Sequence, residues 1–134
     1  MAIILETRQL TKRYKELVAV NSLDLSIRSE ICFGLLGPNG AGKTTTLEMI
    51  EGILPPDTGQ ILFHGKPAAM EFRQNIGIQF QSTALPDYLQ VGEVLHLFSA
   101  FYKKRADLEE IKSVCDLAEF WTRDASQLSG GQRQ

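Results

Sequence analysis

The sequence is poor in the residues that build disulfide frameworks and metal sites. It has two cysteines and two histidines among 134 residues. Cys32 and Cys115 are too far apart for a metal knuckle or a redox pair, and we expect both to be buried free thiols. His64 and His96 have no partners at ligand spacing, so neither is a candidate metal ligand or catalytic group.

Long apolar runs and an excess of charge of one sign are also absent. The longest apolar run, residues 31–37, is far below the ~20 residues of a membrane-spanning helix. Glu6 and Arg8 interrupt the N-terminus, so we expect no signal peptide and a cytosolic protein. Lys+Arg number 14 and Asp+Glu 16, a net charge of −2, which argues against a nucleic-acid partner. Two short basic clusters are predicted to be solvated surface: Lys12, Arg13 and Lys15, and Lys103, Lys104 and Arg105.

What the sequence does contain is the composition of a globular domain, and its length allows one domain or most of one. Hydrophobic residues make up 43% and charged residues 22%. Apolar and polar residues alternate over residues 18–27, which predicts two β-strands joined by a turn at Asn21 and Ser22. The continuous apolar run of residues 31–36 predicts a strand buried on both faces of a parallel sheet. Residues 61–63 and 76–80 predict two further strands.

Three segments have helical periodicity. Residues 43–51 predict a helix that Gly52 ends. Apolar side chains from Val91 to Tyr102 share one helical face, and residues 108–118 carry a second, shorter stripe. Strands with one glycine-rich loop therefore come first and a helical region follows, which predicts an α/β fold.

The glycine-rich loop matches the phosphate-binding pattern of two glycines five residues apart followed by Lys and Ser or Thr. Its residues are Gly37, Pro38, Asn39, Gly40, Ala41, Gly42, Lys43 and Thr44, and Thr45 follows them. The glycines let consecutive N–H groups point at phosphate oxygens, and the N-terminus of the next helix adds positive potential. Lys43 is expected to reach the β- and γ-phosphates, and the Thr44 hydroxyl to bind Mg²⁺. The loop predicts a site for a nucleoside triphosphate.

A second motif near the end of the chain separates the families that share this loop. Leu128, Ser129, Gly130, Gly131 and Gln132 match the signature pentapeptide of ATP-binding-cassette (ABC) ATPases, and the sequence is similar to that family along its whole length. The resemblance implies a P-loop nucleotide-binding domain with an N-terminal antiparallel β part and the start of a helical subdomain. The β part and loop would occupy residues 1–84 and the helical subdomain residues 85–134. No guanine-specific Asn-Lys-x-Asp motif is present, so a GTPase is not expected.

The resemblance also implies roles for single residues. Tyr14 lies where the family has an aromatic residue that stacks on adenine. Gln81 closes the predicted strand 76–80, where the family has a glutamine that contacts Mg²⁺ or the attacking water; Gln79 is its rival, and only position favours Gln81. The expected ligands are therefore ATP and Mg²⁺, with Thr44 and Gln81 beside the metal.

The signature implies partners. In this family the serine and glycines of the signature close over the γ-phosphate held by a second subunit. Ser129, Gly130, Gly131 and Gln132 would therefore complete the partner's site in a head-to-tail dimer. A separate membrane-spanning permease is also implied, which would place the subunit on the inner face of the cell membrane. The run of residues 77–81 and the helix after it are most similar to the drug-export (ABC-2) type.

Residues 1–134 contain none of the family's catalytic groups. The Walker B Asp and Glu and the switch His follow the signature in the family, and no apolar run ending in Asp-Glu occurs in this sequence. We therefore expect an ABC-type ATPase subunit of which this chain alone is inactive, poorly stable and prone to aggregate. Two alternatives stay open: a nucleotide-binding remnant without ATPase activity, and a non-transport ABC protein.

Overall fold

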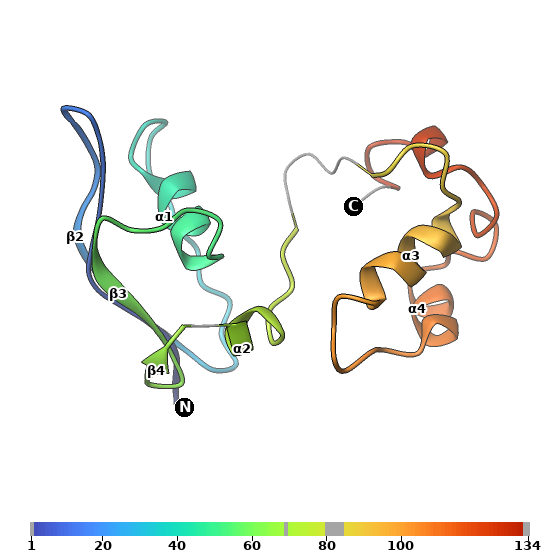
Figure 1. The fold of residues 1–134 in the computed structure, drawn as a ribbon, viewed down its shortest axis with the longest axis horizontal. Coiled ribbons are helices and arrows are strands. Elements are labelled where there is room, and N and C mark those ends of the chain that lie inside the picture. Colours follow the sequence, from blue (N-terminus) through green and yellow to red (C-terminus); the bar gives the residue numbers. More distant parts are fainter. Residues whose placement is uncertain (1, 69, 80–84, 133–134) are drawn as a thin grey trace. The chain divides into compact units, whose positions relative to one another are not determined.

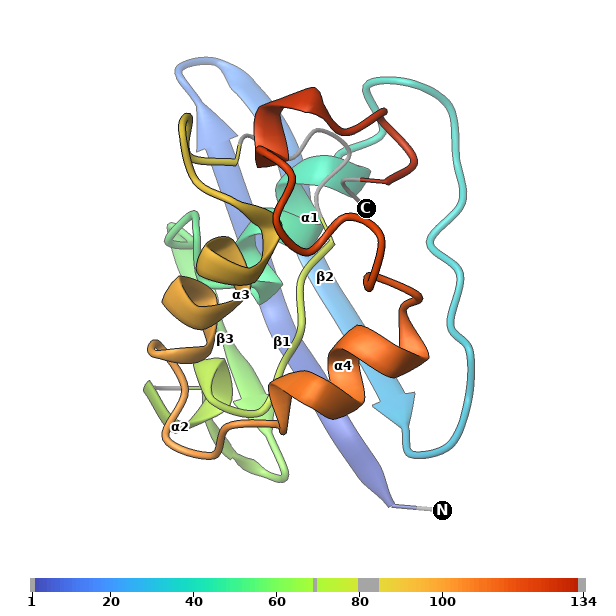
Figure 2. The same ribbon diagram turned by 90° about the vertical axis from the view of Figure 1, so that its right-hand side faces the viewer.

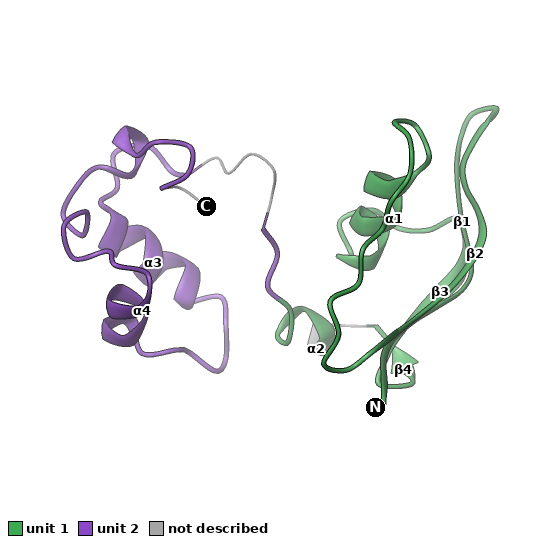
Figure 3. Cartoon of the chain, turned by 180° about the vertical axis from the view of Figure 1, so that it is seen from behind, with its two compact units in different colours: residues 1–76 green, residues 77–134 purple. Residues whose placement is uncertain are grey.

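The computed structural model describes residues 2–68, 70–79 and 85–132. They form two compact units, Met1–Ile76 and Gly77–Gln134 (Figure 3). The first unit holds an antiparallel sheet and two helices, and the second is built from short helices and turns. Each unit is described by itself below.

The sheet of the first unit has four strands in the order β2-β1-β3-β4 (Figure 1). They are β1 (Ile3–Tyr14), β2 (Leu17–Arg28), β3 (Thr58–Phe63) and β4 (Lys66–Pro67). All three pairings are antiparallel. The antiparallel β part expected from the sequence is confirmed, as is the short strand at residues 61–63.

The turn predicted at Asn21 and Ser22 is wrong, because β2 runs through these residues as one strand paired with β1. Ser22 adopts a positive φ of 48°, and its N–H donates to the Thr11 hydroxyl at 2.9 Å. The register of the two strands shifts here as a β-bulge. The Thr11 side chain accepts the hydrogen bond that the backbone ladder loses at this point.

Helix α1 (Lys43–Ile50) packs on the sheet and closes the core of this unit. Leu10 of β1, Val20 of β2 and Met49 of α1 are buried together, and Leu23, Leu54 and Ile61 pack against them. Gly52, at φ 74°, follows the helix in the left-handed conformation, which confirms the predicted stop. Residues of β1, β2 and β3, which are distant in the sequence, thus hold the helix in place.

The strand predicted over residues 31–36 is wrong. The segment has no strand conformation, and most of its residues are exposed, Leu36 at 92%. A strand needs backbone partners, and no described strand pairs with this segment. The four-stranded sheet has β2 and β4 as its edge strands and does not include residues 31–36. Residues 76–79 form no strand either, and Phe80 lies outside the described residues.

The second unit contains α3 (Val91–Ser99), α4 (Leu108–Val114) and a turn of 3₁₀ helix, η1 (Ala125–Gln127). Both predicted helices are confirmed, although α3 ends before Tyr102. The N-terminus of α3 has a capping box, in which the Gln90 N–H donates to the Glu93 carboxylate at 2.8 Å. Short helix α2 (Met70–Arg73) belongs to the first unit.

The start of α3 is joined to the segment before the signature. The N–H groups of Val91 and Gly92 donate to the carbonyls of Arg123 and Trp121, each at 3.0 Å. A Cβ at Gly92 would lie 2.7 Å from the Trp121 indole, so only glycine allows this approach. Val91, Val94, Ala125 and Leu128 are buried and form the centre of the unit.

The prediction of buried thiols is wrong, because Cys32 and Cys115 are both exposed. Cys32 lies in the segment that lacks a strand partner, and Cys115 caps the C-terminus of α4. Within the described ranges, no group of three His, Cys, Asp or Glu residues could hold a metal ion. Every helix in those ranges is too short or too polar to cross a bilayer.

The last residues of β1 are joined to the loop before β3 by one carboxylate. Asp57 accepts from the Arg13 N–H at 2.7 Å and from the Lys12 ammonium at 2.9 Å. Lys12 is only 9% exposed, so the prediction that it belongs to a solvated cluster is wrong. The Arg13 amide, and next the Lys12 ammonium, hold the pKa of Asp57 below its usual value.

This pair predicts a loss of stability in acid. The pKa of Asp57 is lower in the folded than in the unfolded chain. The ionised carboxylate therefore contributes to the free energy of unfolding above the unfolded pKa, and this contribution is lost as the pH falls through the folded pKa. We expect wild type to exceed Asp57→Asn in free energy of unfolding near neutral pH, and the difference to shrink below about pH 4. Urea unfolding followed by far-ultraviolet circular dichroism measures both; a difference independent of pH would contradict the assignment.

Candidate nucleotide-binding site

The glycine-rich loop leads directly into α1. Gly42 is the residue before the helix and has φ 81°, and the first helical hydrogen bond runs from the Thr46 N–H to the Gly42 carbonyl at 2.8 Å. The N-cap residue Gly42 has no side chain that could cap this end of α1, and the first turn of the helix has no acidic residue. The amides of the first turn are therefore without the side-chain acceptor that a cap provides, which suits them to bind an anion.

Close packing against β2 fixes the position of this helix end. A Cβ at Gly42 would overlap the carbonyl oxygen of Ala19 and approach Val20 Cγ2 to 3.3 Å. Glycine is needed here for its positive φ and for this contact. The end of the loop is thus fixed against β2.

The side chain of Lys43 folds back on its own loop. Its ammonium donates to the carbonyls of Gly37 and Pro38 at 2.8 and 2.7 Å. The Ala41 N–H donates to the Pro38 carbonyl at 3.3 Å, which closes the turn. Thr44 is exposed and Thr45 half-buried. The loop thus places a cation and a helix N-terminus together, the electrostatic combination that favours phosphate.

Tyr14 ends β1 at the tip of the β1–β2 hairpin, where its side chain is 45% exposed. The hairpin tip and the loop before α1 lie at the same end of the first unit (Figures 1 and 2). The fold therefore brings the predicted aromatic residue and the predicted phosphate loop to one end of the sheet. Gln81 lies outside the described residues, and Gln79 is exposed.

The signature motif, in the second unit, has the reciprocal hydrogen bonds of a capping box on a turn. The Ser129 N–H donates to Gln132 Oε1 at 2.9 Å, and the Gln132 N–H donates to the Ser129 hydroxyl at 3.4 Å. Among the residues that the structure describes, none has an atom within 4 Å of a Cβ placed at Gly130 or Gly131, their chain neighbours apart. The motif therefore presents two glycines to open space on a turn closed by its serine and glutamine.

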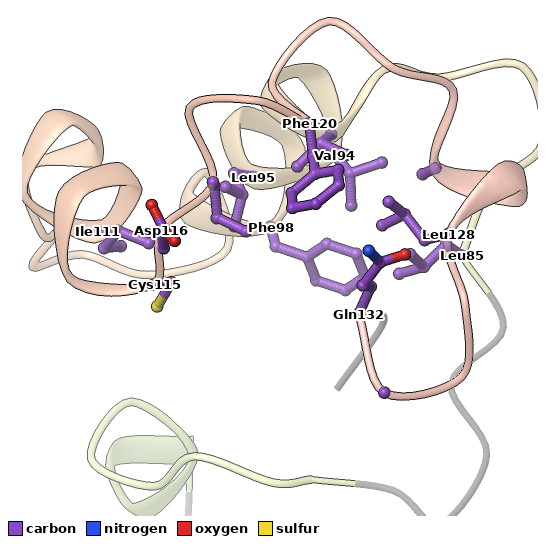
Figure 4. A pocket seen from close by; sticks show the side chains of 14 residues that line it. Leu85, Val94, Leu95, Phe98, Ile111, Cys115, Asp116, Phe120, Leu128 and Gln132 are labelled. Atoms are coloured by element: carbon purple, nitrogen blue, oxygen red, sulfur yellow. The ribbon is translucent and has the colours of Figure 1, made fainter.

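An apolar cavity of about 680 Å³ lies beside the signature (Figure 4). Side chains of α3, among them Val94 and Phe98, form part of its wall, and Phe120 and Leu128 face them. Gly131 and Gln132 also line it, so the signature turn borders the apolar interior of its own unit.

Before the signature, hydrogen bonds from the Ser126 hydroxyl and N–H lower the pKa of Asp124.

Sequence reasoning missed the pairing of Lys12 with Asp57. The sequence places Lys12 only in a basic cluster that is predicted to be solvated, and it assigns no role to Asp57. The available signal is the position of Lys12 two residues after Leu10, which places both on one face of a strand. An amine on the buried face of a strand indicates an acceptor elsewhere in the chain.

Comparisons with known proteins agree on a family. The family described as "ABC transporter" matches residues 20–134. Nod factor export ATP-binding protein I of Cupriavidus metallidurans is 36% identical over 142 aligned residues, covering 100% of this chain and 47% of that protein. Sulfate/thiosulfate import ATP-binding protein CysA of Pectobacterium atrosepticum is 35% identical over 141 residues, covering 97% and 43%. The chain spans less than half the length of these two relatives.

The fold agrees with solved cassettes. The structure of cbiO1 from Clostridium perfringens, part of the ABC transporter complex cbiONQ, superposes with a TM-score of 0.75 at 27% identity. The match covers 99% of this chain and 58% of that one. The expected P-loop cassette fold is thus confirmed.

The contact of Gly42 with β2 predicts an unequal effect of two alanine substitutions. Gly40 has a similar φ of 84° but open space around it, so Gly40→Ala carries only the backbone cost, about 1 kcal/mol. Gly42→Ala adds the overlap with Ala19, and we expect about 2–4 kcal/mol. Urea unfolding of both variants measures the two losses. Equal losses would show that α1 does not need this approach to β2.

Proposed function

Because the chain belongs to the ABC transporter family, we propose that it is the ATP-binding part of a transporter's ATPase subunit. The observation that carries the proposal is the uncapped N-terminus of α1 with Lys43 folded over the loop before it. Backbone N–H groups, a helix dipole and an ammonium converge there, and polyphosphate is the ligand that this combination suits.

We assign the polyphosphate to residues 37–45 and the adenine to the exposed ring of Tyr14. When phosphate enters, Lys43 exchanges the carbonyls of Gly37 and Pro38 for phosphate oxygens, and the loop carbonyls return to solvent. The residues that would hold Mg²⁺ are Thr44 and Gln81, of which Thr44 is exposed at the start of α1. The metal would neutralise phosphate charge in the complex.

Ser129, Gly130, Gly131 and Gln132 are assigned to the γ-phosphate of a second subunit. The open space around both glycines and the closed Ser129–Gln132 turn support this role, because an incoming phosphate meets no side chain of the described residues there. A head-to-tail pair with two nucleotides in its interface follows from two-fold symmetry. Water activation is assigned to no residue among these 134.

We further propose that ATP hydrolysis in the whole subunit drives movement of a substrate through a separate permease, with the subunit on the inner face of the cell membrane. The named complex of cbiO1 supports assembly with other transporter components. We propose export as the direction of transport because of the resemblance to the drug-export type. The similar proteins include one named for export and one named for import. We keep residues 1–84 as the β part and loop, and residues 85–134 as the start of the helical subdomain.

Two lysines separate the phosphate site from general electrostatic attraction. We expect Lys43→Ala to weaken ATP binding at least about tenfold, because the ammonium that pairs with phosphate is lost. Lys104→Ala removes the same charge from an exposed position in the other unit and should leave the dissociation constant unchanged. Isothermal titration with Mg-ATP measures both constants. Equal effects of the two substitutions would refute the phosphate loop.

A further inference from the structure

We propose that Asp57, acting through Lys12, is the positioning residue that holds Tyr14 where it can stack on the base of the nucleotide. The inference rests on the proposed function, in which Tyr14 carries the adenine. It adds a pair of charged residues, 45 positions apart in the sequence, that serves recognition of the base and not of the phosphates.

The first step is the end of the β1–β3 ladder. The last pair is Thr11 with Thr58, and the Asp57 N–H still donates to the Thr11 carbonyl at 3.0 Å. β3 starts at Thr58, so its backbone does not reach the Arg13 N–H. The Asp57 carboxylate takes this N–H at 2.7 Å and so continues the ladder by one side chain. The last residues of β1 are thereby held on the β3 side.

The second step is the use of both carboxylate oxygens. One accepts from the Arg13 N–H, and the other accepts from the Lys12 ammonium at 2.9 Å. The same ammonium donates to the Pro55 carbonyl at 2.8 Å. Because the Lys12 side chain is 11% exposed, its charge is tolerated only with these acceptors, which leaves it little freedom to move.

The third step links this ammonium to the aromatic ring. Lys12 pairs across the hairpin with the core residue Val20, so it points to the face of β1 that α1 covers. Tyr14 follows two residues later, beyond a register irregularity of the ladder between Lys12 and Arg13, and pairs with Leu17. The Lys12 ammonium lies 6.0 Å from the centroid of the Tyr14 ring, at the outer limit of a cation–π contact. Lys12 therefore orients the ring, while 45% of Tyr14 stays exposed for a flat ligand.

These contacts predict a separation between base and phosphate recognition. The contacts of Asp57 are with Thr11, Lys12 and Arg13, all on β1, whereas polyphosphate is assigned to residues 37–45. Loss of the carboxylate should disturb the orientation of Tyr14 and leave the loop before α1 in place. The measurable quantity is the ratio of dissociation constants for ATP and for inorganic triphosphate.

The test measures the binding of both ligands by isothermal titration for the wild-type chain and five variants, one of them a control. Tyr14→Ala should weaken ATP binding about fivefold or more, because stacking on one base is lost, and should leave triphosphate unchanged. Asp57→Ala and Lys12→Met should each weaken ATP binding about three- to tenfold with triphosphate unchanged. Asp57→Ala added to Tyr14→Ala should cause no further loss, because the two residues act as one unit.

Asp24→Ala is the matched control. Asp24 accepts the backbone N–H and the side-chain amide of Gln9, each at 2.6 Å, so it supports the same strand at a point remote from Tyr14. It should leave the ratio unchanged even if it lowers the melting temperature. Lys12→Met keeps the buried stem and removes only the ammonium, so it tests the inference even if Asp57→Ala unfolds.

The outcomes distinguish this inference from the function on which it rests. If Tyr14→Ala changes the ratio and neither Asp57→Ala nor Lys12→Met does, Tyr14 binds the base without this pair and the inference is wrong. If the two variants weaken ATP and triphosphate equally, they act on the fold alone, which also overturns it. If Tyr14→Ala itself leaves the ratio unchanged, the assignment of adenine to Tyr14 fails.

Discussion

The packing of α1 against the β1–β2 hairpin is the contact on which the rest of the first unit depends. Leu10, Val20 and Met49 bury one another, and Gly42 brings the start of α1 against the Ala19 carbonyl. A helix N-terminus attracts anions only within its first turn, so its usefulness depends on where the sheet holds it. Here the sheet holds it at the end where β1 stops at Tyr14.

The same hairpin therefore has two tasks. Its buried face anchors the helix whose N-terminus is suited to phosphate, and its tip carries an aromatic ring suited to a base. Asp57, in the loop before β3, reinforces the tip by completing a ladder that the backbone of β3 leaves one residue short. Apolar burial places the glycine-rich loop, and in our proposal a charged pair positions the ring.

The parts that the sequence predicts well depend on neighbouring residues. The loop, α1 and its stop at Gly52 follow from residue types at fixed spacing, and so does the start of α3 at Val91. The parts that fail depend on distant partners. Residues 31–36 have the composition of a buried strand but no described strand beside them, and β2 continues through Ser22 because Thr11 supplies an acceptor. The spacing of Lys12 from Leu10 indicates a buried amine, but nothing local identifies Asp57 as its acceptor. The roles of Tyr14, the loop and the signature come from family resemblance and stay predictions, and Gln81 lies outside the described residues.

The central claim is that the loop before α1 receives the phosphates of ATP. The most direct measurement is a titration of the ¹⁵N-labelled chain with Mg-ATP, followed by the amide resonances of residues 37–45. The account predicts that these amides, led by those of the first turn of α1, shift most and saturate together. Shifts confined to other residues, with the loop amides unchanged at saturation, would contradict it.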